Sequence, residues 1–173
     1  MSENVFAPSA DETSSLKSSR ALKTILYGGL AVGVLDGLWA VILSGRRGVG
    51  PIRVFQFISS GLFGRSAFSG GVRAALLGLL IHFMIATTLA AIYYGASKRL
   101  PMLVRQAVLW GVLYGFVVYL VMNYVVLPLS AAPPLPSSIG RLLVGLIGHA
   151  LVVGLPISLI ARRCAKNNLR DRN

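Results

Sequence analysis

Apolar residues occupy most of this chain in four long runs, separated by short polar or basic stretches. We delimit four segments of 23 residues each: Leu22–Ser44, Ala74–Ala96, Gln106–Pro128 and Ile139–Ala161. At 1.5 Å of rise per residue, a helix of this length reaches roughly 34 Å, which is enough to cross the hydrocarbon core of a bilayer. The pattern therefore predicts an all-α membrane protein, a bundle of four transmembrane helices within residues 22–163.

A shorter apolar segment, residues 51–69, lies between the first two predicted spans. Its arginines Arg53 and Arg65 leave only eleven residues between them, too few to cross a bilayer. One helical face carries Phe55, Ile58 and Leu62, with Gln56 and Ser59 off that face. We expect a short helix that is either interfacial or re-entrant.

The two ends of the chain and the third loop are polar or rich in proline. Residues 1–21 contain Ser, Asp and Glu but lack the basic start and apolar core of a signal peptide, so we expect a flexible cytoplasmic tail before an uncleaved first span. Residues 164–173 form a basic cytoplasmic tail. The proline-rich third loop, residues 129–136, is expected to run extended.

The basic residues are unevenly divided between the two sides of the predicted bundle. Four spans place both termini on one side, which holds eleven basic residues: Lys17, Arg20, Lys23, Lys98, Arg99, Arg105, Arg162, Arg163, Lys166, Arg170 and Arg172. The other side holds six: Arg46, Arg47, Arg53, Arg65, Arg73 and Arg141. Because cytoplasmic loops are enriched in Lys and Arg, this bias predicts cytoplasmic N- and C-termini.

A net charge of +12 would ordinarily suggest nucleic-acid binding. Here the charges flank the spans, and no basic helix face or zinc motif accompanies them, so we expect no nucleic-acid partner. Anionic lipid headgroups of the bilayer are the simpler partner. A homo-oligomer or a membrane-protein partner stays open. The single cysteine, Cys164, excludes an internal disulfide and receives no role.

Each predicted span carries one notable polar residue: Asp36, His82, Asn123 or His149. Counted from the cytoplasmic ends of the spans, all four fall within a slab roughly 8 Å thick in the outer half of the bilayer. An ionisable side chain at this depth costs on the order of 2.5–3.5 kcal/mol, so its presence calls for a role. On a helical wheel, Asn123 points away from the small residues of its span, toward a second subunit or lipid.

Small residues accompany three of these polar groups and indicate close helix packing. The helix-packing positions are Gly29, Gly33 and Gly37 in the first span, Gly78 in the second, and Gly145 with Pro156 in the fourth. Similar depth and small neighbours together predict an intramembrane cluster of Asp36, His82 and His149.

Three functions remain open for a protein with this pattern, which we expect not to be an enzyme. The leading one is the handling of protons or a small solute by the Asp/His cluster. The second is a structural or assembly subunit of a larger membrane complex, with the polar groups serving as interhelical hydrogen bonds. The third is a redox protein in which His82 and His149 ligate a haem; otherwise we expect neither a cofactor nor a metal.

Four stretches resemble a group of small bacterial inner-membrane proteins, the YagU-like family. They are FISSGLFGRSAFSGG (57–71), LLGLLIHF ending at Phe83, VMNYVVLPLSAAP ending at Pro133 and IGHALVVGLPISLIARR ending at Arg163. The resemblance implies four spans in a bacterial cytoplasmic membrane and carries over no catalytic residue. Asp36 departs from that family's pattern, which makes the Asp–His cluster a feature of this subgroup.

Overall fold

The computed structural model describes residues 10–136 and 138–170, which are helical over most of their length. Four helical stretches are long and apolar enough to cross a membrane: Ala21–Gly45, Gly71–Arg99, Ala107–Leu129 and Ile139–Lys166. Each includes nearly all of one predicted span. The prediction of an all-α bundle with four membrane-spanning helices is confirmed.

Eight α-helices and three tighter or wider turns follow one another along the described chain. The α-helices are α1 (Ala10–Gly45), α2 (Pro51–Phe63), α3 (Gly71–Arg99), α4 (Met102–Arg105), α5 (Ala107–Val121), α6 (Leu127–Leu129), α7 (Ile139–His149) and α8 (Leu155–Arg170). The 3₁₀ turn η1 (Gly64–Ser69) follows α2, and the π-turns η2 (Met122–Val126) and η3 (Ala150–Gly154) continue α5 and α7.

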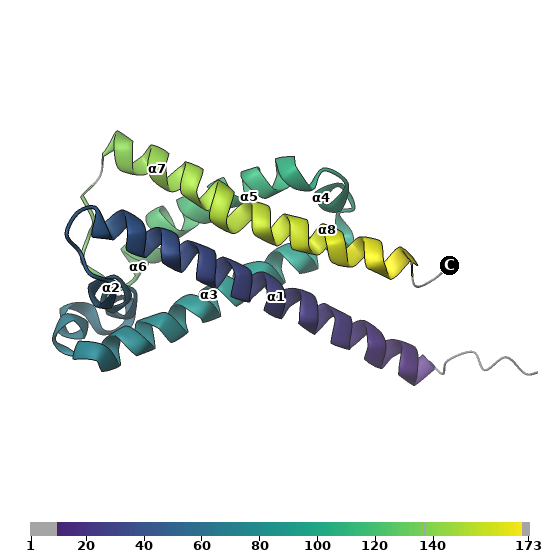
Figure 1. The fold of residues 1–173 in the computed structure, drawn as a ribbon, viewed down its shortest axis with the longest axis horizontal. Helices are drawn as coiled ribbons and strands as arrows, with labels where there is room; N and C mark the ends of the chain where they lie inside the picture. Colours follow the sequence, from purple (N-terminus) through teal and green to yellow (C-terminus); the bar gives the residue numbers. More distant parts are fainter. Residues whose placement is uncertain (1–9, 137, 171–173) are drawn as a thin grey trace, which may run out of the picture.

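The start of α1 and the end of α8 lie at the same end of the bundle, whereas α2 and the start of α7 lie at the other (Figure 1). We call the second end the loop end. The short helix α2 begins and finishes there, as a segment too short to span must. The predicted short helix between spans one and two is confirmed.

Both ends of the chain differ from the expected flexible tails. The helix α1 already begins at Ala10, so residues 10–21 are helical, and α8 continues to Arg170. Neither Gly nor Pro occurs from Ala10 to Tyr27. Once the apolar span has formed, each added residue extends an existing helix without a new nucleus. Residues 1–9 and 171–173 of the expected tails lie outside the described residues.

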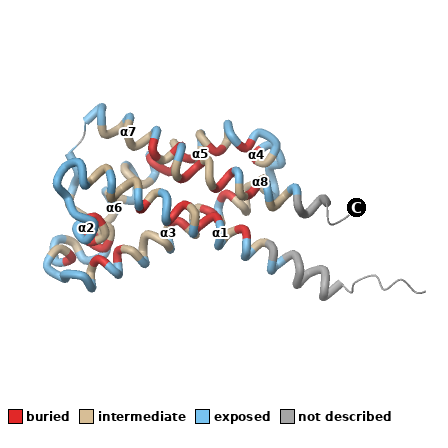
Figure 2. Tube along the Cα trace, in the orientation of Figure 1, coloured by how far each residue is buried: buried red, intermediate tan, exposed pale blue. Residues whose placement is uncertain are grey.

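The core lies where α1, α3, α5 and α8 cross, as the buried segments in Figure 2 show. It is built from small and medium side chains around one buried aromatic ring: Val32, Ala86, Ala90, Tyr93, Leu103, Val118, Val153, Ile157 and Ala161. Larger apolar side chains, such as Leu76 and Leu80, point outward. This arrangement suits a membrane protein, because small residues let helices approach closely while lipid solvates the large ones.

The glycine stripe of α1 lies against α3. A Cβ atom at Gly29 would stand 2.7 Å from the Thr87 Cα atom, and one at Gly37 would stand 3.3 Å from the His82 ring. A Cβ atom at Gly33 would overlap the Phe83 ring. The stripe therefore allows a closer approach than residues with side chains would permit.

The helix α2 packs on α3 through Gly78, where a Cβ atom would overlap the Phe55 carbonyl oxygen. The polar side of α2 faces inward: Ser59 is fully buried, and the buried Gln56 side chain donates to the Gly71 carbonyl at 2.9 Å. Leu62, in contrast, is 67% exposed. In a bilayer this orientation is favourable, because polar groups need protein partners and apolar groups do not.

The third loop contains no helix between residues 130 and 136, as its prolines predict. Its backbone joins α2, because the Ala131 N–H donates to the Gly61 carbonyl at 2.9 Å. The loop thereby closes the loop end of the bundle over α2.

Candidate functional site

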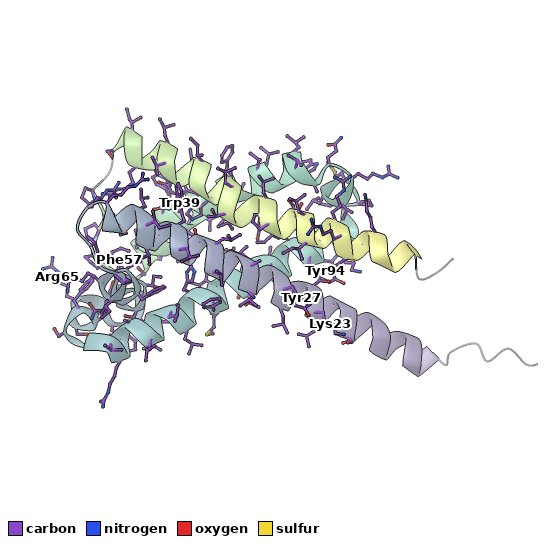
Figure 3. The ribbon with its side chains drawn as sticks, in the orientation of Figure 1. Lys23, Tyr27, Trp39, Phe57, Arg65 and Tyr94 are labelled. Atoms are coloured by element: carbon purple, nitrogen blue, oxygen red, sulfur yellow. The ribbon has the colours of Figure 1, made fainter. Side chains whose placement is uncertain are left out.

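A cavity of about 850 Å³ opens among α1, α2, η1, the third loop, α5 and α7. Its walls combine apolar and aromatic side chains with an unusual number of charged ones. Trp39, Phe57 and Arg65, three of its lining residues, lie toward the loop end, whereas Lys23, Tyr27 and Tyr94 lie toward the termini (Figure 3). The cavity therefore occupies the loop half of the bundle.

Four arginines line this cavity: Arg47, Arg53, Arg65 and Arg141. The first follows α1, the next two belong to α2 and η1, and the last lies in the first turn of α7. The Arg53 guanidinium stands 4.2 Å from the centre of the Phe68 ring, which restrains it by a cation–π contact. Against these four cations the lining contains one carboxylate, Asp36.

Arg141 has the least ordinary environment of the four. Its Nε and Nη1 atoms are buried, and neither has a hydrogen-bond partner among the described residues. The residue is held by its backbone, since its N–H donates to the Ser138 hydroxyl that caps α7 and its carbonyl accepts from the Tyr119 hydroxyl. Burying unpaired guanidinium donors is costly, so a ligand that accepts from them would be strongly favoured.

Three of the four predicted polar residues line the same cavity: Asp36, Asn123 and His149. The Asn123 amide nitrogen donates to the Tyr119 carbonyl at 2.9 Å. The His149 Nδ1 atom lies 3.1 Å from the Gly145 carbonyl oxygen. Asp36 forms no hydrogen bond or ion pair within the described part of the chain.

His82 does not join them. Its Nε2 atom lies 2.9 Å from the Gly33 carbonyl, and its ring meets Phe55 and Phe83 edge-on. The ring is thus held between α1, α2 and α3 and is not part of the cavity lining. The expected cluster of Asp36 with both histidines is therefore divided, with one histidine in a helix interface and the other in the cavity.

The position of Asn123 also differs from the helical-wheel expectation. Gly115, on the neighbouring face of α5, packs against the backbone of His149 and Ala150. Asn123 points to one side of this packing surface, and the cavity lies on that side. The helical wheel predicted that Asn123 points away from the glycines of its span, toward lipid or a second subunit. In the structure the Asn123 side chain lines the cavity instead.

The haem hypothesis needs both histidine rings to face one space. The cavity is lined by His149 and not by His82, so the structure offers no shared space for bis-histidine ligation. Among the residues described, no group of three or more His, Cys, Asp or Glu side chains is placed to hold a metal ion. The two histidines therefore do not fit bis-histidine ligation of a haem.

Sequence reasoning missed the arginines as a binding site, because it used them to assign the sides of the membrane, to limit the short helix and to expect contact with lipid headgroups. One signal was available: Arg53 and Arg65 interrupt an apolar segment instead of flanking it. An arginine in such a place needs a partner, a snorkelling path or a ligand.

Comparison with protein families, with curated proteins and with solved structures gives no match to this chain. The kind of ligand must therefore be inferred from the side chains that line the cavity. Clustered guanidinium groups with apolar walls are suited to binding an anion, since guanidinium donors match phosphate and carboxylate oxygens.

Proposed function

We propose that this integral membrane protein binds a small anionic solute in the arginine-lined cavity. The solute carries a phosphate or carboxylate group, and the apolar walls contact the rest of it. This narrows the solute-handling hypothesis and transfers it from the Asp/His cluster to a site with four cations. The proposal includes cytoplasmic termini, which the excess of Lys and Arg on that side supports. It also includes a bacterial inner membrane, as the resemblance to YagU-like proteins implies. The loop end then faces the outer compartment.

The observation that carries the proposal is the Arg141 side chain. Two of its nitrogens are buried, with no hydrogen-bond partner in the part of the chain that the structure describes, at the wall of a cavity that three further arginines line. A neighbouring carboxylate is the usual way to compensate such a group, but Asp36 forms no ion pair with any described residue. The α7 N-terminus adds a partial positive charge at the same place. An incoming anion would satisfy all of these groups together.

Binding of inorganic phosphate by the full-length protein in neutral detergent tests the proposal. We would compare the wild type with Arg141→Gln and with Arg73→Gln, which removes an equal charge from an exposed position outside the cavity. Phosphate should raise the melting temperature of the wild type and of Arg73→Gln through binding to the folded state. In Arg141→Gln the affinity should fall about ten-fold or more, because a buried charge-assisted pair is lost.

Short-chain phosphatidic acid serves as a second probe, because a lipid headgroup presents the same phosphate chemistry. Tighter binding of this probe than of phosphate would identify a lipid as the ligand. Equal or weaker binding would identify a water-soluble solute. The proposal fails if neither probe binds, or if Arg141→Gln binds both as tightly as Arg73→Gln. The structural-subunit alternative would then be preferred.

A further inference from the structure

The charges of the cavity are arranged along its depth. Arg141 and His149 both line it and lie eight residues apart in α7, which corresponds to about 12 Å along the helix axis. Arg47, Arg53 and Arg65 come from the segments that connect or cap the spans at the loop end. The cations thus lie toward the loop end of the cavity, which we call its mouth, and His149 lies toward the opposite end, which we call its floor.

Asp36 belongs to the floor as well. The helix α1 runs toward the loop end, and Trp39, three residues beyond Asp36, lies against Gly148, where a Cβ atom would collide with the indole ring. Since α7 runs in the opposite direction, Asp36 lies at or below the level of His149. The carboxylate therefore lies below Arg141 by most of the depth of the cavity.

The floor presents hydrogen-bond acceptors from α1 and α7. Asp36 contributes a carboxylate that has no partner among the described residues. Because a carbonyl only accepts, the contact of His149 with Gly145 places the ring proton on Nδ1 and leaves Nε2 as an acceptor in the neutral ring.

From this arrangement we infer that the ligand is a zwitterion, with its anionic group beneath the mouth arginines and an ammonium group at the Asp36–His149 floor. An ammonium ion donates hydrogen bonds and accepts none, which suits a carboxylate and an imidazole nitrogen that accept them. It also compensates a carboxylate that is otherwise expensive within a membrane. The inference rests on the proposed anion site and adds the second charge of the ligand.

The order of the two sites favours a water-soluble zwitterion over a phospholipid. In an aminophospholipid the phosphate lies between the amine and the acyl chains. With the amine at the floor and the phosphate under the arginines, the acyl chains would extend beyond the arginines toward the polar loop end. A linear solute with one charge at each end has no such conflict.

Two phosphonates of equal length test the inference: 6-aminohexylphosphonate, and hexylphosphonate, which lacks the amine. Affinities are measured by calorimetry on the full-length protein in neutral detergent. In the wild type the amine should improve affinity about ten-fold, as expected for a charge-assisted contact out of bulk water. Asp36→Asn should abolish this advantage while still binding hexylphosphonate. Asp11→Asn, which removes an equal charge near the beginning of α1, should keep the advantage.

Binding of the two phosphonates to the wild type with equal affinity would overturn the inference and leave the anion site standing. Persistence of the amine's advantage in Asp36→Asn would also overturn it, because the carboxylate would then have no part in recognition. If neither phosphonate bound the wild type, the anion site itself would fail along with the inference. Hexylphosphonate binding by Asp36→Asn reports in the same experiment that the variant is folded.

Discussion

The contact between α2 and α3 gives the sharpest prediction about the fold. Gly78 has no room for a side chain: a Cβ atom there would overlap the Phe55 carbonyl oxygen and stand 3.2 Å from the Ser59 nitrogen. Both neighbours are backbone atoms of one helix, so neither can rotate away. The substitution Gly78→Ala must therefore displace α2 as a unit from the face on which its buried serines lie.

The size of the effect follows from two opposing contributions. Overpacking a well-filled contact costs about 1–3 kcal/mol, and backbone overlap places this site at the upper end. Alanine has a helix propensity about 1 kcal/mol more favourable than that of glycine, which offsets part of the loss. We expect a net destabilisation of roughly 2 kcal/mol, about a 30-fold change in the folding equilibrium.

Gly95→Ala is the matched control, because the same substitution in the same helix meets nothing within 4 Å of the new Cβ atom. It should leave stability unchanged or raise it by up to about 1 kcal/mol. Both variants are unfolded with dodecyl sulfate in mixed micelles and followed by the fluorescence of Trp39 and Trp110. Equal stability of the two variants would refute the described packing of α2 on Gly78.

Two further substitutions separate helix packing from ligand binding. His82→Leu removes the contact of the ring with the Gly33 carbonyl and should lower the free energy of unfolding by about 1 kcal/mol. Phosphate affinity should not change, because His82 is outside the cavity; a loss of binding in a folded variant would contradict the assignment. Tyr114→Phe removes the 2.8 Å hydrogen bond to the Leu89 carbonyl and should cost a similar amount in the dodecyl sulfate titration, whereas unchanged stability would show that this bond is not formed.

The number and approximate limits of the spans could be predicted from the sequence because hydropathy is a local property. Each predicted span needs only its own residues to be recognised, and the four helices agree with the prediction to within a few residues at most ends. The start of α1 at Ala10 was not predicted. The polar composition of residues 1–21 suggested a flexible tail, and hydropathy does not detect a polar helix that extends out of the membrane.

The site could be predicted only in part. Residue counting gives the depth of a side chain but not the neighbour it faces, and His82 shows the difference. It shares the depth of Asp36, yet α2 folds back onto α3 and encloses the ring with Phe55. That contact arises from the path of the first loop, which no helical wheel describes. Asn123 is a second case, because the helical wheel separated it from the glycines of its span but could not show that a cavity lies beside them.

The arginine cluster depends most strongly on tertiary structure. Arg47 and Arg141 are far apart in sequence and appeared only as charges on one side of the membrane. They come together because α1 and α7 both reach the loop end, with α2 and the third loop between them. The sequence shows that these arginines lie on one side of the membrane, but it does not show that they line one cavity.

Collisional quenching of Trp39 measures most directly whether the cavity attracts anions. The chain has two tryptophans, so a Trp110→Phe variant leaves only Trp39, which lines the cavity with Arg141. We expect iodide to quench this residue more strongly than caesium, and Arg141→Gln to reduce iodide quenching by about two-fold or more while quenching by neutral acrylamide stays constant. Equal quenching by iodide and caesium, unchanged in Arg141→Gln, would contradict an anion-attracting cavity.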